Sequence, residues 1–72
     1  MTYPSSKTVE RIRQEYPTGT RVELLKMDDT HAPLIGTLGT VLGVDDTGSL
    51  IMRWDNGSGL NVIYGVDLVR KL

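Results

Sequence analysis

The fold is decided by residues 39–64, which read GTVLGVDDTGSLIMRWDNGSGLNVIY. Short apolar segments alternate there with turn residues. Residues 49–55 form the clearest segment, because Leu50, Met52 and Trp54 recur at every second position and fall on one face of an extended chain. This stretch therefore predicts a central β-strand with one buried face.

Two tight turns join this central strand to its neighbours in the chain. The turn at residues 45–48 leads back to a strand over residues 39–44. The Asn-Gly pair at residues 56–57 leads forward to a return strand over residues 60–64. Turn residues also flank two further strand-like segments. The remaining predicted strands are residues 20–24 and residues 68–71.

The first predicted strand changes its pattern near its end. Val22 and Leu24 lie on one face of an alternating strand, whereas Leu25 and Met27 continue on the opposite face. Such a change indicates either a β-bulge or a strand that is covered on both sides. The following residues, 28–36, have no clear period and are predicted to form a loop.

The N-terminal segment predicts a short helix over residues 5–16. Val9, Ile12 and Tyr16 recur on one side of it, and either of two adjacent serines can cap its start. The helix is expected to end near residue 15, because Pro17 disfavours helical geometry at the residue before it. So short a helix needs tertiary packing to be stable, so we expect it to dock on the sheet.

These elements predict an all-β protein built as a small closed barrel of about five antiparallel strands. A length of 72 residues leaves room for one domain, predicted over residues 1–72 with the barrel in residues 19–72. No connection in the barrel segment is long enough for a crossover helix, which excludes a parallel βαβ fold. We expect the helix to cap an open end or side of the barrel.

The composition excludes several functional classes. Eight Lys and Arg residues against nine Asp and Glu residues leave a net charge of −1, which argues against a dedicated polyanion binder. The chain has no cysteine, so disulfides, thiolate metal sites and thiol nucleophiles are excluded. It has no long apolar run, and its first residues lack the pattern of a secretory signal. A cytoplasmic location is therefore expected.

Six short motifs are distinctive as a set. They are YPTGTRV at 16–22, MDD at 27–29, GTLGTV at 36–41, VDDTG at 44–48, WDNG at 54–57 and YGVD at 64–67. With these motifs the chain resembles an uncharacterised domain-of-unknown-function family of small bacterial, phage and mobile-element proteins. The resemblance implies an SH3-like barrel, and its Gly-x-x-Gly-x-Val core is similar to the KOW motif of ribosomal and transcription-factor domains. It implies no catalytic residues.

No pattern in the chain points to catalysis. Asp28, Asp29 and His31 form the only cluster that mixes carboxylates with an imidazole, but their spacing matches neither an EF-hand loop nor a zinc motif. Such aspartates also open turns by accepting hydrogen bonds from nearby backbone N–H groups. With one histidine and no cysteine, no nucleophile constellation is present. We therefore predict no enzyme activity, no metal and no cofactor.

The predicted loop over residues 28–36 is the leading candidate for a partner-binding surface. His31, Pro33, Leu34 and Ile35 form an apolar contact patch that a purely connecting loop does not need. In the alternative interpretation, the two aliphatic residues fold back over the barrel mouth and complete the core. The sequence leaves both interpretations open.

Trp54 and Tyr64 are candidates for the same partner-binding surface. Trp54 is favoured as a core residue, because it shares a face with the other apolar residues of its strand. The functional interpretation instead puts Trp54 at the rim of a groove with Tyr64 and Tyr16.

The leading functional prediction is a non-enzymatic module that binds another protein in an accessory, regulatory or inhibitory role. One alternative is KOW-like nucleic-acid binding. Its basic residues would be Arg21, Lys26, Arg53 and Arg70. A second alternative is the binding of a small anionic ligand such as a nucleotide.

Overall fold

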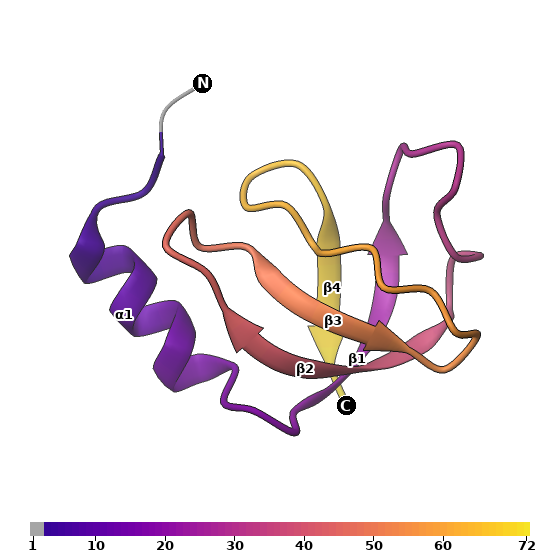
Figure 1. Cartoon of the computed structure of the whole chain (residues 1–72), viewed down its shortest axis with the longest axis horizontal. Helices are drawn as coiled ribbons and strands as arrows, with labels where there is room; N and C mark the ends of the chain where they lie inside the picture. The colour runs from indigo at the N-terminus through magenta and orange to yellow at the C-terminus, as the bar shows by residue number, and fades with distance from the viewer. Residues whose placement is uncertain (1–2) are drawn as a thin grey trace.

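A computed structural model describes residues 3–72 of the chain as one helix and four strands (Figure 1). The first two residues of the predicted domain lie outside the described residues. In chain order the elements are α1 (Ser6–Glu15), β1 (Arg21–Lys26), β2 (Leu38–Val44), β3 (Leu50–Trp54) and β4 (Leu68–Lys71).

The four strands form one open antiparallel sheet in the order β3-β2-β1-β4. This confirms a small β-rich fold with an N-terminal helix. The described residues do not form the predicted closed barrel of about five strands. The return strand predicted over residues 60–64 is absent from them. Only one isolated antiparallel bridge, between Leu50 and Val62, remains of that pairing.

The reason lies in how the outer edge of β3 is covered. The backbone N–H of Trp54 donates to the carbonyl of Ser58 at 3.0 Å, and that of Met52 donates to the side-chain oxygen of Asn61 at 3.2 Å. An amide side chain thus replaces the backbone carbonyl that a regular strand would supply. The edge is protected without a fifth strand.

The core lies on one face of the sheet, as the alternation in β3 predicts. Leu50, Met52 and Trp54 are buried, and the residues between them are exposed. Trp54 is 1% exposed, and its indole N–H donates to the carbonyl of Leu60 at 2.8 Å. A Cβ atom at Gly39 would lie 2.5 Å from the Trp54 ring, so the strand needs glycine there for the ring to lie against it.

Met27 departs from its predicted face. It is buried in the same core cluster as Val22 and Leu24, although strict alternation puts it on the opposite face. The pairing of β1 with β4 shifts register between Leu24 and Lys26, which accounts for the change. The extra residue of such an irregularity reverses the side of every residue after it. The bulge interpretation is therefore confirmed.

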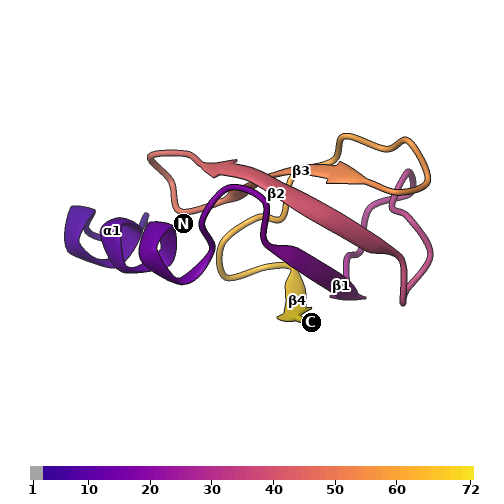
Figure 2. The same ribbon diagram turned by 90° about the horizontal axis from the view of Figure 1, so that it is seen from below.

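The helix lies beside one end of the sheet rather than across its face (Figures 1 and 2). Its predicted limits are confirmed: the Ser5 hydroxyl caps the start by accepting from the Thr8 N–H, and α1 ends at Glu15. Val9 is buried, and Ile12 packs against the core cluster. No helix within residues 3–72 has the length and apolar character needed to cross a bilayer.

Candidate functional site

The connection from β1 to β2, residues 27–37, has a backbone held by hydrogen bonds at both ends. The N–H of His31 donates to a carboxylate oxygen of Asp29 at 2.7 Å, which is an Asx-type turn. The hydroxyl of Thr37 donates to the carbonyl of Leu34 at 2.6 Å, and the N–H of Gly36 donates to the carbonyl of Leu24 at 2.8 Å. We call this segment the 27–37 loop.

The aliphatic side chains of this loop point into solvent. Leu34 is 84% exposed and Ile35 is 61% exposed. The alternative in which both fold back over the core therefore does not hold. His31 is also exposed, whereas Pro33 is buried and anchors the loop instead of forming its surface.

The predicted aromatic residues do not join this surface. Trp54 is enclosed in the core, so it is not accessible to a partner in the folded protein. Tyr64 is 42% exposed and lies at the helix end of the molecule, where it lines a small apolar groove of about 210 Å³ with Ile12 and Tyr16. The two tyrosines thus share a groove as predicted, but the tryptophan and the 27–37 loop take no part in it.

A second groove was missed by the sequence analysis. Its volume is about 470 Å³, and it lies between the start of the 27–37 loop and the segment that leads from β3 to β4. We call it the acidic groove, because three aspartates and no basic residue line it. Its lining residues are Met27, Asp28, Asp29, Gly59, Leu60, Asn61, Ile63, Val66 and Asp67.

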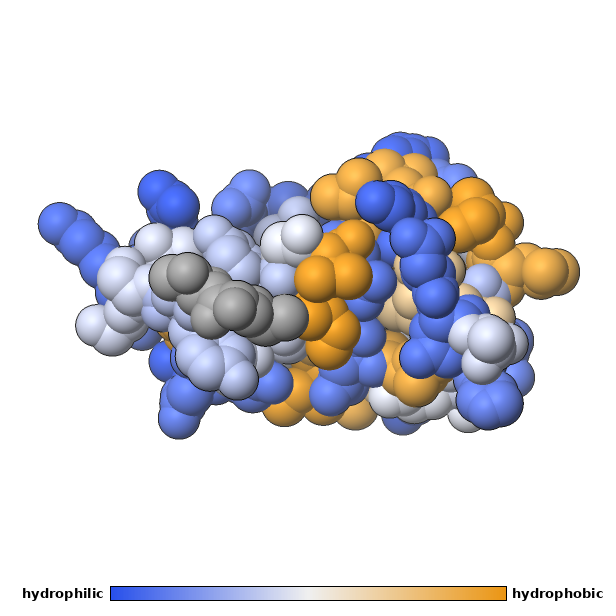
Figure 3. Space-filling view, turned by 90° about the horizontal axis from the view of Figure 1, so that it is seen from above, coloured by the Kyte–Doolittle hydropathy of each residue, from blue (hydrophilic) through white to orange (hydrophobic). Residues whose placement is uncertain are grey.

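The hydrophobic surface of the protein is unevenly distributed. Seen from above, hydrophobic residues gather on the half of the molecule away from the helix, with hydrophilic residues between them (Figure 3). Besides the two aliphatic residues of the loop, the chain exposes Ile63 by 41%, Val66 by 46% and Leu68 by 56%. Ile63 and Leu68 also line the small groove beside the helix. The helix end is more polar.

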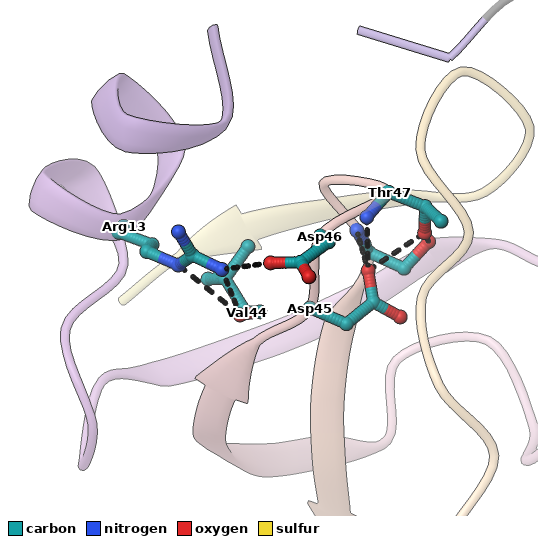
Figure 4. Close-up of polar contacts among 6 residues, drawn as sticks. Arg13, Val44, Asp45, Asp46 and Thr47 are labelled. Carbon is teal, nitrogen blue, oxygen red and sulfur yellow. Dashed lines mark hydrogen bonds and ion pairs between the residues drawn. The ribbon is translucent and has the colours of Figure 1, made fainter. Parts of the chain in front are cut away.

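The polar side chains of the turn from β2 to β3 make hydrogen bonds and an ion pair within the protein (Figure 4). One carboxylate oxygen of Asp45 accepts from the Thr47 hydroxyl at 2.6 Å, the Thr47 N–H at 2.9 Å and the Ser49 N–H at 3.0 Å. The Thr47 hydroxyl bond is the largest factor that lowers the pKa of Asp45 below its ordinary value. Arg13 of the helix donates to the carbonyl of Val44 and pairs with Asp46 at 3.0 Å.

This turn lies at the opposite end of β2 from the 27–37 loop (Figures 1 and 2). Its aspartates are therefore not brought to Asp28, Asp29 and His31, as a shared metal site would require. Within residues 3–72, no group of three His, Cys, Asp or Glu residues is arranged to hold a metal ion.

The candidate nucleic-acid residues are partly gathered on the exposed face of the sheet, but carboxylates lie among them. Arg21 donates to both carboxylate oxygens of Asp55 at 2.8 and 2.6 Å, and this pairing lowers the pKa of Asp55. Arg70 pairs with Glu23 at 2.6 Å. Of the two other residues of the predicted set, Arg53 lies on β3. Lys26 lies at the end of β1, after the register shift in its pairing with β4.

These features define a small β-rich protein with an open four-stranded antiparallel sheet and one helix at its end. Residues 5–72 match the family model described as Domain of unknown function (DUF4314), and the chain belongs to that family. The predicted membership of an uncharacterised family is thereby confirmed. No curated protein and no solved structure matches the chain.

Proposed function

We propose that this protein is a non-enzymatic module that binds another protein through its 27–37 loop. One observation carries the proposal: adjacent aliphatic side chains, Leu34 and Ile35, are 84% and 61% exposed on a loop whose backbone is fixed by hydrogen bonds. Burial of exposed apolar side chains against a partner lowers the free energy of the complex, because it removes apolar surface from water. Because the loop is already ordered, little conformational entropy is lost on binding.

We further propose that the fold is a variant of the SH3-like barrel. The strand order β3-β2-β1-β4 and the Leu50–Val62 bridge support a sheet that curls toward closure. In that arrangement the 27–37 loop corresponds to the first long loop of SH3-type barrels, which often lines their ligand site. A bacterial or phage setting, a cytoplasmic location and an accessory, regulatory or inhibitory role stay predictions from the resemblance.

The two alternative functions have weaker support. KOW-like nucleic-acid binding needs free basic side chains, yet Arg21 and Arg70 already have carboxylate partners. Nucleic-acid binding would show as affinity for RNA or DNA that falls steeply with salt. A small anion would be repelled by the acidic groove, and the groove beside Tyr16 and Tyr64 is mainly apolar. Of two further hollows with basic residues, one holds Arg13, which already pairs with Asp46, and the other is lined by Glu10 as well as Lys7 and Arg11.

The proposal is tested by capturing partners from a bacterial lysate treated with nuclease, with wild type and Leu34→Asp as baits. We expect a protein that wild type retains and that Leu34→Asp loses, with an affinity for the purified partner reduced by at least about 30-fold. Tyr3→Asp is the matched control, because it puts the same charge at another exposed apolar position and should retain the partner.

The thermal midpoint separates binding from folding. Since Leu34 makes little contact with the core, Leu34→Asp should melt within about 2 °C of wild type. A large drop in the midpoint, or equal retention of the partner by Leu34→Asp and wild type, would contradict the proposal.

A further inference from the structure

The acidic groove is lined by apolar residues together with charged side chains of one sign. Ile63 and Val66, which are 41% and 46% exposed, lie in its lining with the aspartates. Its volume of about 470 Å³ is within the range of roughly 300–1,000 Å³ that is usual for ligand sites. The groove therefore has room for one or two long side chains of a bound segment.

The negative charge of this groove is not neutralised internally. Asp28, Asp29 and Asp67 bring three carboxylates to the lining, in a chain whose overall formal charge is only −1. Within residues 3–72 none of the three forms an ion pair, whereas Asp46, Asp55 and Glu23 each pair with an arginine.

The hydrogen bonds of these aspartates go to the backbone. Asp29 accepts from the N–H of His31, and Asp67 accepts from the N–H of Ile63 at 2.8 Å. These bonds hold the two carboxylates in position and leave their charge uncompensated.

From this charge and shape we infer that the acidic groove receives a basic segment of the partner protein, with a Lys or Arg side chain beside an aliphatic one. Long basic side chains suit such a site, because their methylene stems cover apolar surface while the charged ends reach the carboxylates. The groove and the proposed contact surface share one segment of the chain, since Met27, Asp28 and Asp29 of the groove belong to the same loop as Leu34. The inference rests on the proposed function and specifies the chemistry of the partner.

The groove is tested with a random dodecapeptide phage library selected on immobilised wild-type protein. Selected peptides should be enriched in Lys or Arg next to Leu, Ile, Val or Met. The most enriched peptide is then synthesised with a fluorescent label, and its affinity is measured by polarisation at low and high salt. Affinity should fall with salt, because Asp28 and Asp29 are exposed to solvent and Asp67 is partly exposed.

The deciding variant is the triple substitution Asp28→Asn, Asp29→Asn and Asp67→Asn. Asparagine keeps a side-chain oxygen that can accept the backbone hydrogen bonds, so the charge is removed while the turns are retained. We expect the peptide to bind about tenfold more weakly or worse. The matched control removes the same charge at the helix end. It consists of Glu10→Gln, Glu15→Gln and Asp46→Asn, and it should bind the peptide as wild type does.

Three results would overturn the inference: no enrichment, enrichment of peptides without basic residues, or equal affinity of the triple variant and wild type. These failures are distinct from failure of the proposed function. If Leu34 still governs retention of a lysate protein while basic peptides are not selected, only the groove assignment is wrong. If basic peptides bind the groove while Leu34→Asp retains every captured protein, the role of the 27–37 loop is wrong.

Discussion

Strand β2 lies between two connections that contain the same kind of aspartate turn but differ in the contacts of their other side chains. Each contains an aspartate that accepts a hydrogen bond from a backbone N–H two residues later: Asp29 from His31, and Asp45 from Thr47. In the turn after β2, one oxygen of that aspartate accepts three hydrogen bonds, and the neighbouring Asp46 pairs with the helix. The 27–37 loop before β2 instead directs aliphatic side chains and carboxylates into solvent.

The two connections therefore use their polar side chains differently. The turn after β2 uses its side chains to hold the helix, so few of its polar groups are left for a partner. The 27–37 loop satisfies its backbone with local hydrogen bonds, some of them to the side chains of Asp29 and Thr37, and the aliphatic side chains of Leu34 and Ile35 stay exposed. An ordered loop with unused apolar and charged side chains is suited to recognition.

The largest difference in stability between the two connections is expected when their aspartates are replaced. Asp45→Ala removes the acceptor for Thr47 and Ser49 and should cost about 2 kcal/mol, which is a drop of roughly 10 °C in the thermal midpoint. Asp29→Ala removes one exposed hydrogen bond to His31 and should cost about 0.5 kcal/mol. Chemical denaturation of both variants measures this contrast. Equal losses in the free energy of unfolding would mean that the two aspartates contribute equally to stability, which contradicts the prediction.

A smaller difference in stability is expected at one glycine in each connection. Both have a positive φ, +79° at Gly48 and +94° at Gly36, so alanine should cost about 1 kcal/mol at either position from backbone strain. At Gly48 the new Cβ would also lie 3.0 Å from Pro4 and 3.3 Å from Ile12, whereas at Gly36 the nearest atom, from Glu23, is 3.8 Å away. Gly48→Ala should therefore lose about 0.5–1 kcal/mol more than Gly36→Ala. A larger loss for Gly36→Ala would show that the 27–37 loop is the more tightly packed connection.

The smallest expected effect is a difference in pH dependence. The pKa of Asp45 is lowered on folding, first by the Thr47 hydroxyl, so its carboxylate stabilises the protein fully above the unfolded pKa. That stabilisation is lost as the pH falls through the lower, folded pKa, in the range below about pH 4. Thr47→Val should weaken the loss of stability in acid, whereas Thr30→Val in the other connection should leave it unchanged. Denaturation curves from pH 6 to pH 2 measure the effect, and parallel curves for wild type and Thr47→Val would contradict it.

Much of the fold could be predicted because its determinants are local. The serine cap and the end of α1 depend on neighbouring residues, and the alternation in β3 follows from the period of an extended chain. The fifth strand could not be excluded in this way. The side chain of Asn61 takes the place of a backbone carbonyl at the edge of β3, and no periodicity reveals such a substitution.

Only part of the candidate site could be predicted from the sequence. Leu34 and Ile35 stood out as aliphatic residues in a loop, but their exposure depends on the bonds that fix the loop backbone. The acidic groove was missed, because Asp67 is far along the chain from Asp28 and only folding brings them to one lining. Local sequence carried no signal for the groove, because Lys26 lies two residues before Asp28 and Arg70 lies three residues after Asp67.

The β-rich class, the helix limits, the burial of Leu50, Met52 and Trp54 on one face of β3 and the positions of the turns follow from the sequence, because each depends on contacts or periods within a few residues. The tertiary structure alone set the open sheet and the inward side of Met27. It also decided which carboxylates pair with arginines and which remain free. These features depend on register shifts and on contacts between distant segments, where a displacement of one residue changes which side chains meet.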